Sequence, residues 1–504
     1  MNDNKIKKIV IAGGGTAGWM TAAAFSKVLG CTNYAIHLVE SEEIGTIGVG
    51  EATIPHIQKF NQILDIDENE FMKKTQATFK LGIEFINWKK LGHSYIHPFG
   101  AYGEDINAFP FHQYWLKMKS CGLASSLEKY SIATMAARHN KFTRPLNING
   151  SPLSDFGYAF QFDAGRYAQF LRSYSESRGV IRTEGKIASV DLCDSNGYIK
   201  SLTLTDGQVI DGDFFIDCTG MRGILIEGAL KTGFEDWSHW LPCNSAVAVP
   251  CEKIEEPIPY TRATAHTAGW QWRIPLQHRT GNGHVFSSQY MSDDEATGIL
   301  LKNLDGAVIA DPRVIRFKTG RRTKFWNKNC VAIGLSSGFL EPLESTSIHL
   351  IQTAISKLIN LFPSKSFMED GAELYNKNTI FEYERIRDFL ILHYKATERT
   401  DSDFWNYCRD MDVPEYLREK IKLYESTGRI YRENEELFSI PSWLAVFEGQ
   451  GIIAEDYHPA IDSMPLAELT EKFKSYESVI NKCINFMPDH AQYVADNCKA
   501  EKVY

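Results

Sequence analysis

A glycine-rich turn between two short apolar runs constrains the fold of this chain more than any other feature. Residues 8–12 are an apolar run that favours a buried strand, and the turn G-G-G-T-A-G at 13–18 follows it directly. An apolar helical stretch covers 19–29, and a second strand pattern at 34–39 ends in Glu40. A strand, glycine turn, helix and strand that close on an acid form the dinucleotide-binding fingerprint, in which the acid accepts hydrogen bonds from a ribose.

The turn and the helix start have separate predicted roles in holding a pyrophosphate. Gly13 permits the tight turn, Gly15 lets the backbone approach the phosphates, and Gly18 lets the helix pack closely. Thr16 and Ala17 belong to the turn that leads into the predicted helix, and the helix N-terminus supplies N–H groups and a partial positive charge. The N-terminal residues are therefore predicted to bind the ADP part of a dinucleotide.

The composition is that of an ordinary globular protein. Of the 504 residues 43% are hydrophobic and 23% charged, which excludes disorder and fibrous repeats. The net charge is -9 and basic residues occur only in short clusters, so nucleic acid and anionic membranes are poor partners. No apolar run approaches the roughly 18 residues that span a bilayer. We expect a soluble, cytoplasmic protein with no targeting segment.

The cysteines and histidines indicate neither a metal site nor a redox disulfide. Ten cysteines are scattered along the chain without a C-x-x-C pair, and no histidine cluster has zinc spacing. Unpaired thiols in a long chain suit a reducing compartment. No metal is predicted.

Further strand patterns predict that the nucleotide domain is assembled from distant segments. Residues 186–192 and 199–205 read as a hairpin around Asn196-Gly197, and they lead to a strand that ends near Asp217. Another apolar strand covers 329–334. We predict an α/β fold in which an FAD-binding Rossmann-like, flavin monooxygenase-like domain (1–362) contains an interleaved β-sheet layer. A mainly helical C-terminal cap (363–504) is expected to contribute to the substrate site.

The segment G-W-Q-W-R-I-P at 269–275 alternates with a period of two residues. Trp270, Trp272 and Ile274 therefore share one strand face, and Pro275 marks a strand end or an edge strand. Filling of the core is the ordinary explanation for such an aromatic stripe. Beside a flavin, two indoles would instead shield the isoalloxazine ring from an organic substrate.

Several motifs together resemble those of flavin-dependent halogenases. W-x-W-x-I-P at 270–275 is accompanied by G-E-A-T-I-P at 50–55, H-P-F-G at 97–100, L-Q-H-R-T-G-N-G at 276–283 and E-P-L-E-S-T at 341–346. In this order the motifs strongly resemble the tryptophan halogenase family, from about residue 8 to about residue 450.

This resemblance implies an enzyme that uses reduced FAD, O2 and chloride or bromide. The hypohalous acid that forms travels through a tunnel to a lysine and halogenates an indole or another electron-rich aromatic ring. A separate NAD(P)H-dependent reductase supplies the reduced flavin, with diffusion of FADH2 as one route. The single G-x-G-x-x-G unit of the chain agrees with this arrangement. The oligomeric state is left open, with a homodimer as one option.

The resemblance places the two catalytic residues at Lys80 and Glu344. In T-F-K-L-G-I-E-F at 78–85 the apolar residues alternate with Lys80, so the residues alone predict a solvated strand lysine. Glu344 alone reads as an acid at the start of a helix over 348–362. In the family, the amine holds hypohalous acid, and the carboxylate stabilises the cationic ring intermediate or positions the amine.

The same helix start is expected to bind the halide. Thr346 and Ser347 correspond to the pair whose backbone N–H groups contact chloride in the family. Many relatives carry glycine where Ser347 stands, so the sequence leaves the choice of halide open.

The family also implies further contacts to FAD. Residues 44–53 correspond to a strap across the isoalloxazine ring, for which a plain surface loop is the alternative. Ile187 is expected near the adenine, and Leu335 and Ile348 near the ring. The strap residues expected to contact FAD are Gly48, Gly50 and Ala52.

The substrate side is the least determined part of the sequence. His97 and Phe99 match positions that sandwich the aromatic ring in the family, and Trp443 and Phe447 are expected ring contacts. The segment that grips the amino-acid group of free tryptophan is not recognisable in 437–451. Free tryptophan, a bare indole, an indole within a peptide and another electron-rich arene all remain candidates.

Two other functions are compatible with an FAD-binding scaffold. A single-component FAD monooxygenase would be reduced directly by NADPH and would insert oxygen, but Trp270 and Trp272 would block its substrate from the flavin. A non-enzymatic FAD-binding partner of a biosynthetic complex would make no demand on Lys80 or Glu344.

Overall fold

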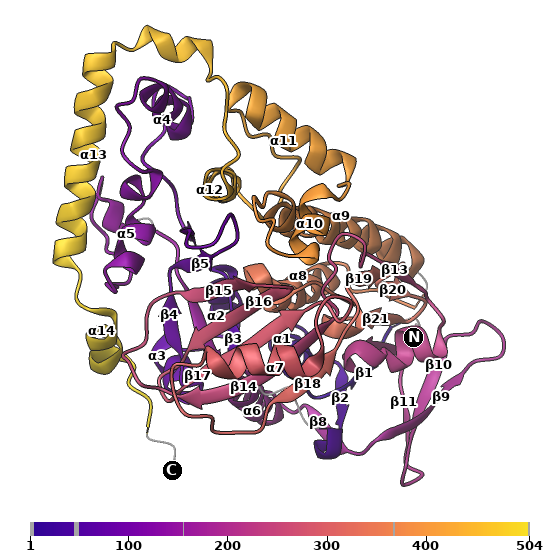
Figure 1. The fold of residues 1–504 in the computed structure, drawn as a ribbon. Coiled ribbons are helices and arrows are strands. Elements are labelled where there is room, and N and C mark those ends of the chain that lie inside the picture. The colour runs from indigo at the N-terminus through magenta and orange to yellow at the C-terminus, as the bar shows by residue number, and fades with distance from the viewer. Residues whose placement is uncertain (1–4, 45–49, 155, 366–367, 502–504) are drawn as a thin grey trace. The chain divides into compact units, whose positions relative to one another are not determined.

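The computed structural model describes residues 5–44, 50–154, 156–365 and 368–501. The chain divides into two compact units, each assembled from three segments. The first unit contains 1–77, 162–239 and 316–384, and the second contains 78–161, 240–315 and 385–504 (Figure 1). The boundary expected between residues 362 and 363 falls within the last segment of the first unit.

The first unit is built on a six-stranded sheet in the order β20-β21-β12-β1-β2-β8. Neighbouring strands from β21 to β8 are parallel, and only β20 runs antiparallel to its neighbour. The strands predicted from the apolar runs are confirmed, since β1 pairs with both β2 and β12. The bounds are β1 Lys8–Ala12, β2 Ala35–Glu40, β8 Ile181–Glu184, β12 Phe214–Asp217, β20 Trp326–Asn327 and β21 Cys330–Ala332.

Helix α1 (Thr16–Val28) follows β1 directly and is buried along most of its length. Its alanines, Ala22 to Ala24, leave room for close packing, and α6 (Ala164–Ser177) and α8 (Ser347–Asn360) both contact it. The helix predicted after the glycine turn is therefore confirmed.

Two small sheets and several short elements complete the first unit. In one sheet β9 (Ile187–Leu192) and β10 (Ile199–Leu204) form the predicted hairpin, and Gly197 adopts a φ of +67° in its turn. The other elements are β11 Val209–Asp211, β13 Phe234–Asp236, β19 Gly320–Arg322, β22 Gly338–Phe339, β3 Gly50–Ala52, α2 His56–Ile63 and α3 Glu68–Lys74.

The second unit is built on a seven-stranded sheet in the order β18-β14-β17-β16-β15-β5-β6. The neighbours from β14 to β15 are antiparallel, β15 and β5 are parallel, and β5 and β6 are antiparallel. The bounds are β5 Gly82–Ile86, β6 Ser94–Pro98, β14 Ser245–Glu252, β15 Thr261–His266, β16 Gly269–Pro275, β17 Arg279–Phe286 and β18 Arg313–Arg316. Strand β16 lies inside this sheet, so Pro275 marks its end rather than an edge.

The alternating pattern at 78–85 does not form one strand, which corrects the sequence interpretation. Strand β4 (Thr78–Lys80) pairs with β7 (Ala159–Asp163), whereas β5 joins the seven-stranded sheet. Leu81 separates the two strands and donates its N–H to the Pro259 carbonyl at 2.7 Å. Both faces of β4 are buried, so alternation between polar and apolar residues does not report exposure here.

The predicted helical character of the C-terminal residues is confirmed. Helix α13 (Leu466–Phe486) contacts α4 (Phe111–Ser120) and α5 (Ile132–Arg138) in the second unit (Figure 1).

Helix α7 (Asp293–Lys302) covers β14 and β17. The other helices are α9 Met368–Lys395, α10 Asp403–Asp410, α11 Glu415–Thr427, α12 Ile440–Gln450 and α14 His490–Asn497.

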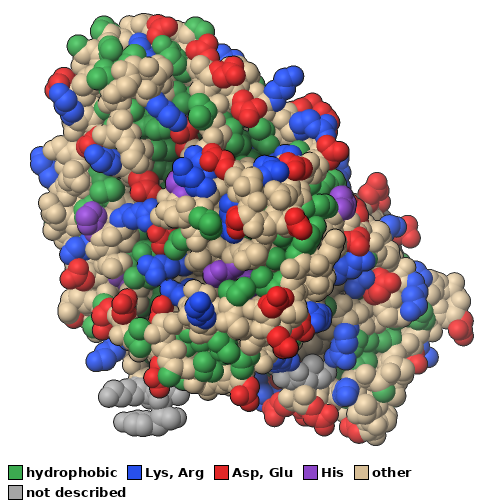
Figure 2. Space-filling view, in the orientation of Figure 1, with side chains coloured by type: hydrophobic (Ala, Val, Ile, Leu, Met, Phe, Trp, Pro, Cys, Tyr) green, Lys and Arg blue, Asp and Glu red, His purple; other side chains and the backbone are tan. Residues whose placement is uncertain are grey.

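Charged side chains of both signs are mixed over the face of the molecule shown in Figure 2. Within residues 5–44, 50–154, 156–365 and 368–501, no helix has the length and apolar character needed to cross a bilayer. Over the same residues no group of three or more His, Cys, Asp or Glu side chains could hold a metal ion.

Candidate active site

The glycine turn of the first unit is sterically specific. Gly13 has a φ of +107°, and a Cβ there would lie 2.2 Å from the Cys218 carbonyl oxygen. A Cβ at Gly18 would lie 1.8 Å from the Gly13 carbonyl oxygen. Both glycines are therefore required for β1 to turn directly into α1.

Gly15 differs from these two glycines because a Cβ there would meet nothing within 4 Å. Gly15 is the N-cap of α1 and has no side chain that could bond to the helix N–H groups. No acidic residue lies in the first turn of the helix. The N–H groups at Thr16 and Ala17 lie at the positive end of the helix, beside the space at Gly15 that is open among the described residues. This cradle fits the pyrophosphate of a dinucleotide.

Glu40 ends β2 and lies against the glycine turn. Its carboxylate accepts hydrogen bonds from Arg182 Nε at 2.5 Å and from Trp19 Nε1 at 3.3 Å. A Cβ at Gly14 would lie 1.5 Å from Glu40 Oε2, so this glycine is also required. Arg172 adds an ion pair to Glu40 Oε1 at 3.6 Å. A carboxylate has about four lone-pair sites, so these contacts still leave capacity for ribose hydroxyls. The dinucleotide fingerprint by itself assigns no role to Gly14 or Arg182.

The other residues expected near FAD lie in separate elements of the first unit. Gly50 and Ala52 are buried in β3, and Gly48 lies outside the described residues. Ile187 begins β9 and is partly buried against the apolar cluster that contains Val10. Leu335 is half-buried in a short 3-10 turn, and Ile348 is 3% exposed in α8.

The start of α8 has the features of an anion-binding helix terminus. Thr346 is the N-cap and provides no side-chain cap, and no acid lies in the first turn of the helix. Thr346 Oγ1 is buried without a hydrogen-bond partner among the described residues. Ser345, immediately before it, has a φ of +58°. A helix start without a capping side chain is a type of position at which proteins bind anions.

Glu344 is placed differently from the sequence expectation. It belongs to a 3-10 turn (Pro342–Glu344) before α8, not to the first turn of the helix, and it is 1% exposed. The left-handed residue Ser345 separates this turn from the helix. Stabilisation by the helix macrodipole therefore does not explain the position of this acid.

A buried network ties the first turn of α8 to α9 and was not expected from the sequence. His349 Nε2 lies 3.1 Å from Glu382 Oε1, and Lys357 Nζ lies 2.5 Å from Glu382 Oε2. The pKa of Glu382 falls to about 2 despite burial, because of its bond to His349 and the charge of Lys357. Burial and the neighbouring His349 lower the pKa of His56 to about 4.

Lys80 of the second unit is fully buried, contrary to the solvated lysine that alternation predicts. Its Nζ lies 5.1 Å from the centroid of the Phe99 ring, a cation–π distance. The structure thus brings together the expected catalytic amine and one of the expected substrate-contacting aromatic rings. Burial of a charged amine is costly, so a fully buried lysine is a candidate functional residue.

The other expected substrate residues lie in one aromatic cluster of the second unit. His97 is 5.7 Å from Phe389 between ring centroids, and Trp443 is 4.9 Å from the same ring. Phe447 stacks on Tyr424 with a centroid distance of 4.5 Å. His97, Trp443 and Phe447 are all buried, and Trp443 Nε1 has no hydrogen-bond partner among the described residues.

A buried ion pair beneath this cluster was not expected from the sequence. Lys420 Nζ lies 2.9 Å from Glu436 Oε2 and 4.1 Å from the centroid of the Trp443 ring. Burial lowers the pKa of Lys420, and the bond to Glu436 opposes that shift. No local sequence pattern signals this pair, since its partners come from α11 and from the segment before α12.

Trp270 and Trp272 share one face of β16 and are 1% and 8% exposed. Their ring centroids are 6.3 Å apart. Trp272 lies opposite Gly283 of β17, where a Cβ would be 2.0 Å from the indole. Glycine at that position therefore lets the ring lie against the neighbouring strand.

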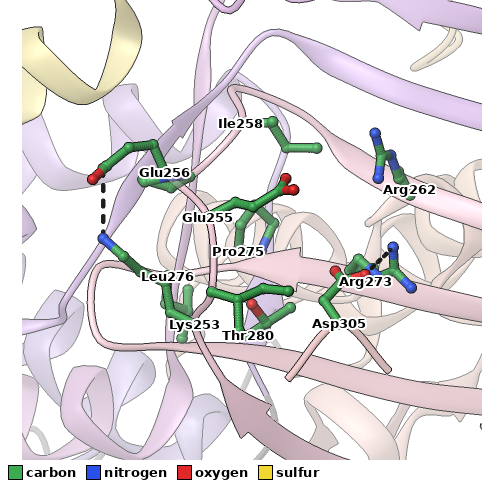
Figure 3. Close-up of a pocket in the computed structure, with 12 residues that line it drawn as sticks. Lys253, Glu255, Glu256, Ile258, Arg262, Arg273, Pro275, Leu276, Thr280 and Asp305 are labelled. Atoms are coloured by element: carbon green, nitrogen blue, oxygen red, sulfur yellow. Dashed lines mark ion pairs between the residues drawn. The ribbon is translucent and has the colours of Figure 1, made fainter. Parts of the chain in front are cut away.

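Figure 3 shows a pocket of the second unit that is lined by side chains of both charges. Arg273 pairs with Asp305 at 3.0 Å, and Lys253 pairs with Glu256 at 3.5 Å. Arg273 alternates with Trp272 along β16, so the pocket lies on the strand face that the tryptophans do not occupy. The lining includes none of the residues predicted for the active site.

The architecture defines a class of protein: an FAD-binding Rossmann-like α/β fold with a helical C-terminal region. A family model described as tryptophan halogenase matches residues 8–466. The chain is 46% identical to the flavin-dependent halogenase Xcc4156 from Xanthomonas campestris, whose structure superposes with a TM-score of 0.96 over 99% of this chain and 100% of that one. For BrvH, a flavin-dependent halogenase from Brevundimonas sp. BAL3, the identity is 47% and the TM-score 0.95, over 98% and 99%.

A curated relative gives the same assignment. The tryptophan 6-halogenase SttH of Streptomyces toxytricini is 35% identical over 98% of this chain and 99% of its own length. The chain therefore belongs to the tryptophan halogenase family. It is an enzyme, a flavin-dependent halogenase that uses FAD, O2 and a halide, with a separate reductase and an aromatic substrate. These comparisons give no support to a single-component monooxygenase.

Proposed function

We propose that this enzyme halogenates the ring of tryptophan or of another indole, with Lys80 as the residue that presents the activated halogen. The observation that carries the proposal is the complete burial of Lys80 beside the Phe99 ring. An amine that is shielded from water can hold a reactive oxidant close to an aromatic substrate without losing it to solvent.

The first unit is proposed to hold FAD at the glycine turn. The pyrophosphate would lie at Gly15 and the start of α1, and a ribose would bond to Glu40. Reduced FAD with O2 supplies the oxidising equivalents that turn a halide into hypohalous acid. The remaining contacts are proposed for Gly13, Gly18, Gly48, Gly50, Ala52, Ile187, Leu335 and Ile348, with Trp270 and Trp272 as the shield of the flavin ring.

The halide is proposed to bind at the start of α8. Thr346 and Ser347 offer helix N-terminal N–H groups, and the buried Thr346 Oγ1 adds an unused polar atom. Chloride and bromide are both small anions that such N–H groups accept, so both are proposed substrates.

Glu344 and Lys80 are proposed to have complementary roles. The Lys80 ammonium donates a hydrogen bond to the oxygen of hypohalous acid and directs the halogen to the ring. As the halogen–oxygen bond breaks, the same group protonates the departing hydroxide, and water is released. The Glu344 carboxylate stabilises the cation that forms when the ring carbon gains halogen, and it accepts the proton that leaves that carbon. The buried state of both side chains strengthens these electrostatic effects.

The arene is proposed to bind against His97 and Phe99, with Trp443 and Phe447 as further ring contacts. Relatives of this chain are named tryptophan 6-halogenase and tryptophan 7-halogenase, which supports an indole ring as the acceptor. The reductase is proposed to use NAD(P)H and to deliver FADH2 by diffusion.

Mass spectrometry tests the proposal directly. The enzyme is supplied with FAD, a flavin reductase, NADH, bromide or chloride, and a panel that contains tryptophan, indole and a tryptophan-containing peptide. We expect a product with the isotope pattern of one added halogen. Lys80→Met should bind FAD normally and form no such product, whereas Lys117→Met, which removes another buried lysine of the second unit, should form it. Halogenated product from Lys80→Met would refute the role of Lys80.

A further inference from the structure

Strand β4, which carries Lys80, pairs with another strand along one edge only. Its other edge bonds to a residue from the C-terminal part of the chain. Strand β4 has three residues and pairs with β7 on one side only. The N–H of Phe79 points to the other side, where it donates to His490 Nε2 at 3.2 Å. His490 is the first residue of α14 and lies beyond the residues matched by the family model.

The hydrogen bonds of His490 fix its tautomer. Because Phe79 N–H can only donate, Nε2 must be the unprotonated acceptor. The proton therefore lies on Nδ1, which donates to the Pro257 carbonyl at 2.6 Å. The imidazole is fully buried, and burial lowers its pKa to about 4. His490 is thus a neutral bridge between β4 and the segment before β15.

The segment before β15 also bonds to residues in and next to β4. Leu81 donates its N–H to the Pro259 carbonyl, and Gln161 Nε2 lies 3.4 Å from both the Phe79 and the Ile258 carbonyl oxygens. Pro257 and Ile258 also form part of the wall of the pocket in Figure 3. Phe79, the residue before Lys80, is therefore held through both its N–H and its carbonyl.

Packing on the opposite face of β4 also depends on this C-terminal segment. The Phe79 ring stacks on Phe142 with a centroid distance of 4.0 Å. Phe142 donates its N–H to the Pro488 carbonyl, and His490 donates its N–H to the Asn140 carbonyl at 2.8 Å. A shift of His490 would therefore move the backbone from which the Lys80 side chain extends.

We infer that His490 is a positioning residue for Lys80: it holds the backbone of β4 so that the amine lies at a fixed place beside the Phe99 ring. This inference rests on the proposed function of Lys80. His490 does not itself touch the reacting atoms. Its effect is on the placement of the amine, and a displacement of about 1 Å in such a group lowers a rate by about 100-fold.

Three variants separate positioning from stability. His490→Phe keeps a ring and removes both bonds, and His490→Gln restores one acceptor and one donor. His284→Phe is the matched control, since His284 is also buried and bonded to a backbone carbonyl but lies in β17. We expect His490→Phe to lower kcat by about 10- to 100-fold with little change in the KM of the arene. His490→Gln should recover most of that loss, and His284→Phe should leave kcat unchanged.

A second readout does not depend on catalysis. Hydrogen exchange at the Phe79 amide should be faster in His490→Phe than in wild type and unchanged in His284→Phe. In wild-type protein, ¹⁵N NMR should show His490 protonated on Nδ1 and not on Nε2 at neutral pH. This measurement does not depend on the folding of any variant. A proton on Nε2, or unchanged exchange at Phe79, would overturn the inference.

The two proposals fail in different ways. If Lys80→Met keeps its activity, the proposed function of Lys80 is refuted, and the inference about its positioning is overturned with it. If Lys80→Met is inactive while His490→Phe halogenates at the wild-type rate, only the positioning role is refuted. If His490→Gln is as impaired as His490→Phe, the positioning role is also overturned. Restoring a hydrogen-bond acceptor and a donor would then not restore kcat.

Discussion

At the scale of single residues, burial decides which of the polar side chains can serve catalysis. Lys80 and Glu344 are at most 1% exposed, and both were ambiguous in the sequence. A desolvated charge interacts more strongly with a developing charge than an exposed one does, because water no longer screens it. Each of these residues therefore has a larger expected effect on turnover than an exposed residue of the same type.

Removal of the Glu344 charge should slow catalysis without removing the side chain. Glu344→Gln keeps the shape of the residue, so the fold and FAD binding should persist. Loss of one electrostatic stabiliser lowers turnover by about 10- to 1000-fold. Single-turnover halogenation with reduced FAD measures this step. Wild-type turnover in the variant would exclude Glu344 from the mechanism.

Two glycines of the same turn should respond differently to alanine. Gly13→Ala places a Cβ 2.2 Å from a carbonyl oxygen at a φ of +107°, so we expect it to destabilise the fold by about 1–3 kcal/mol. Gly15→Ala meets no atom within 4 Å, so the protein should remain as stable as wild type while FAD binding weakens. Thermal unfolding without FAD and a fluorescence titration with FAD measure the two effects. Equal FAD affinity in Gly15→Ala and wild type would contradict the proposed pyrophosphate site.

At the scale of elements, local patterns predicted the strands that pair within the first unit. The apolar runs at β1, β2, β12 and β21 were recognisable because these parallel strands are buried on both faces. The alternation at 78–85 wrongly predicted a solvated Lys80 for the same physical reason. Both faces of β4 are buried, so alternation of polar and apolar residues does not report exposure to solvent.

The contacts that hold the candidate site were beyond prediction from local sequence. Phe79 and His490 are 411 residues apart, and Lys420 and Glu436 belong to different segments around α11 and α12. Lysines are mostly exposed in folded proteins, and histidines are intermediate in burial. Only tertiary packing distinguishes these two buried side chains from ordinary surface residues.

The buried histidines should make the stability of these elements depend on pH. Burial lowers the pKa of His112, His284 and His490 to about 4 from an unfolded value near 6.5. Between these values the unfolded chain binds protons that the folded chain excludes, so the stabilisation is complete above pH 6.5 and is lost as the pH falls towards 4. Each histidine contributes at most about 3 kcal/mol.

Urea unfolding of wild type and His490→Gln at pH 7.5 and pH 5 isolates one of these contributions. Burial raises the pKa of Glu51 to about 7, which acts in the opposite direction, but Glu51 is common to both proteins and cancels in the comparison. We expect wild type to lose more stability than the variant on acidification. Equal losses would show that His490 is not held neutral in the folded protein.

At the scale of the whole molecule, the chain contains one dinucleotide fingerprint, at the start of the first unit. The proposed FAD site uses that fingerprint. Hydride transfer from NADPH requires the nicotinamide to lie against the flavin, and a second dinucleotide site would normally supply that placement. The enzyme should therefore depend on flavin that is reduced elsewhere.

Delivery of chemically reduced flavin tests this dependence. FADH2 prepared with dithionite or light, mixed with the enzyme, bromide, O2 and an indole, should give the halogenated product with no reductase present. NADPH is then added to the FAD-loaded enzyme without a reductase. The flavin absorbance near 450 nm should fall no faster than it does when NADPH reduces free FAD spontaneously. Two unrelated reductases that supply FADH2 at equal rates should give equal yields. Rapid bleaching by NADPH alone would contradict the assignment of a single dinucleotide site, whereas yields that depend on the reductase would contradict delivery by diffusion.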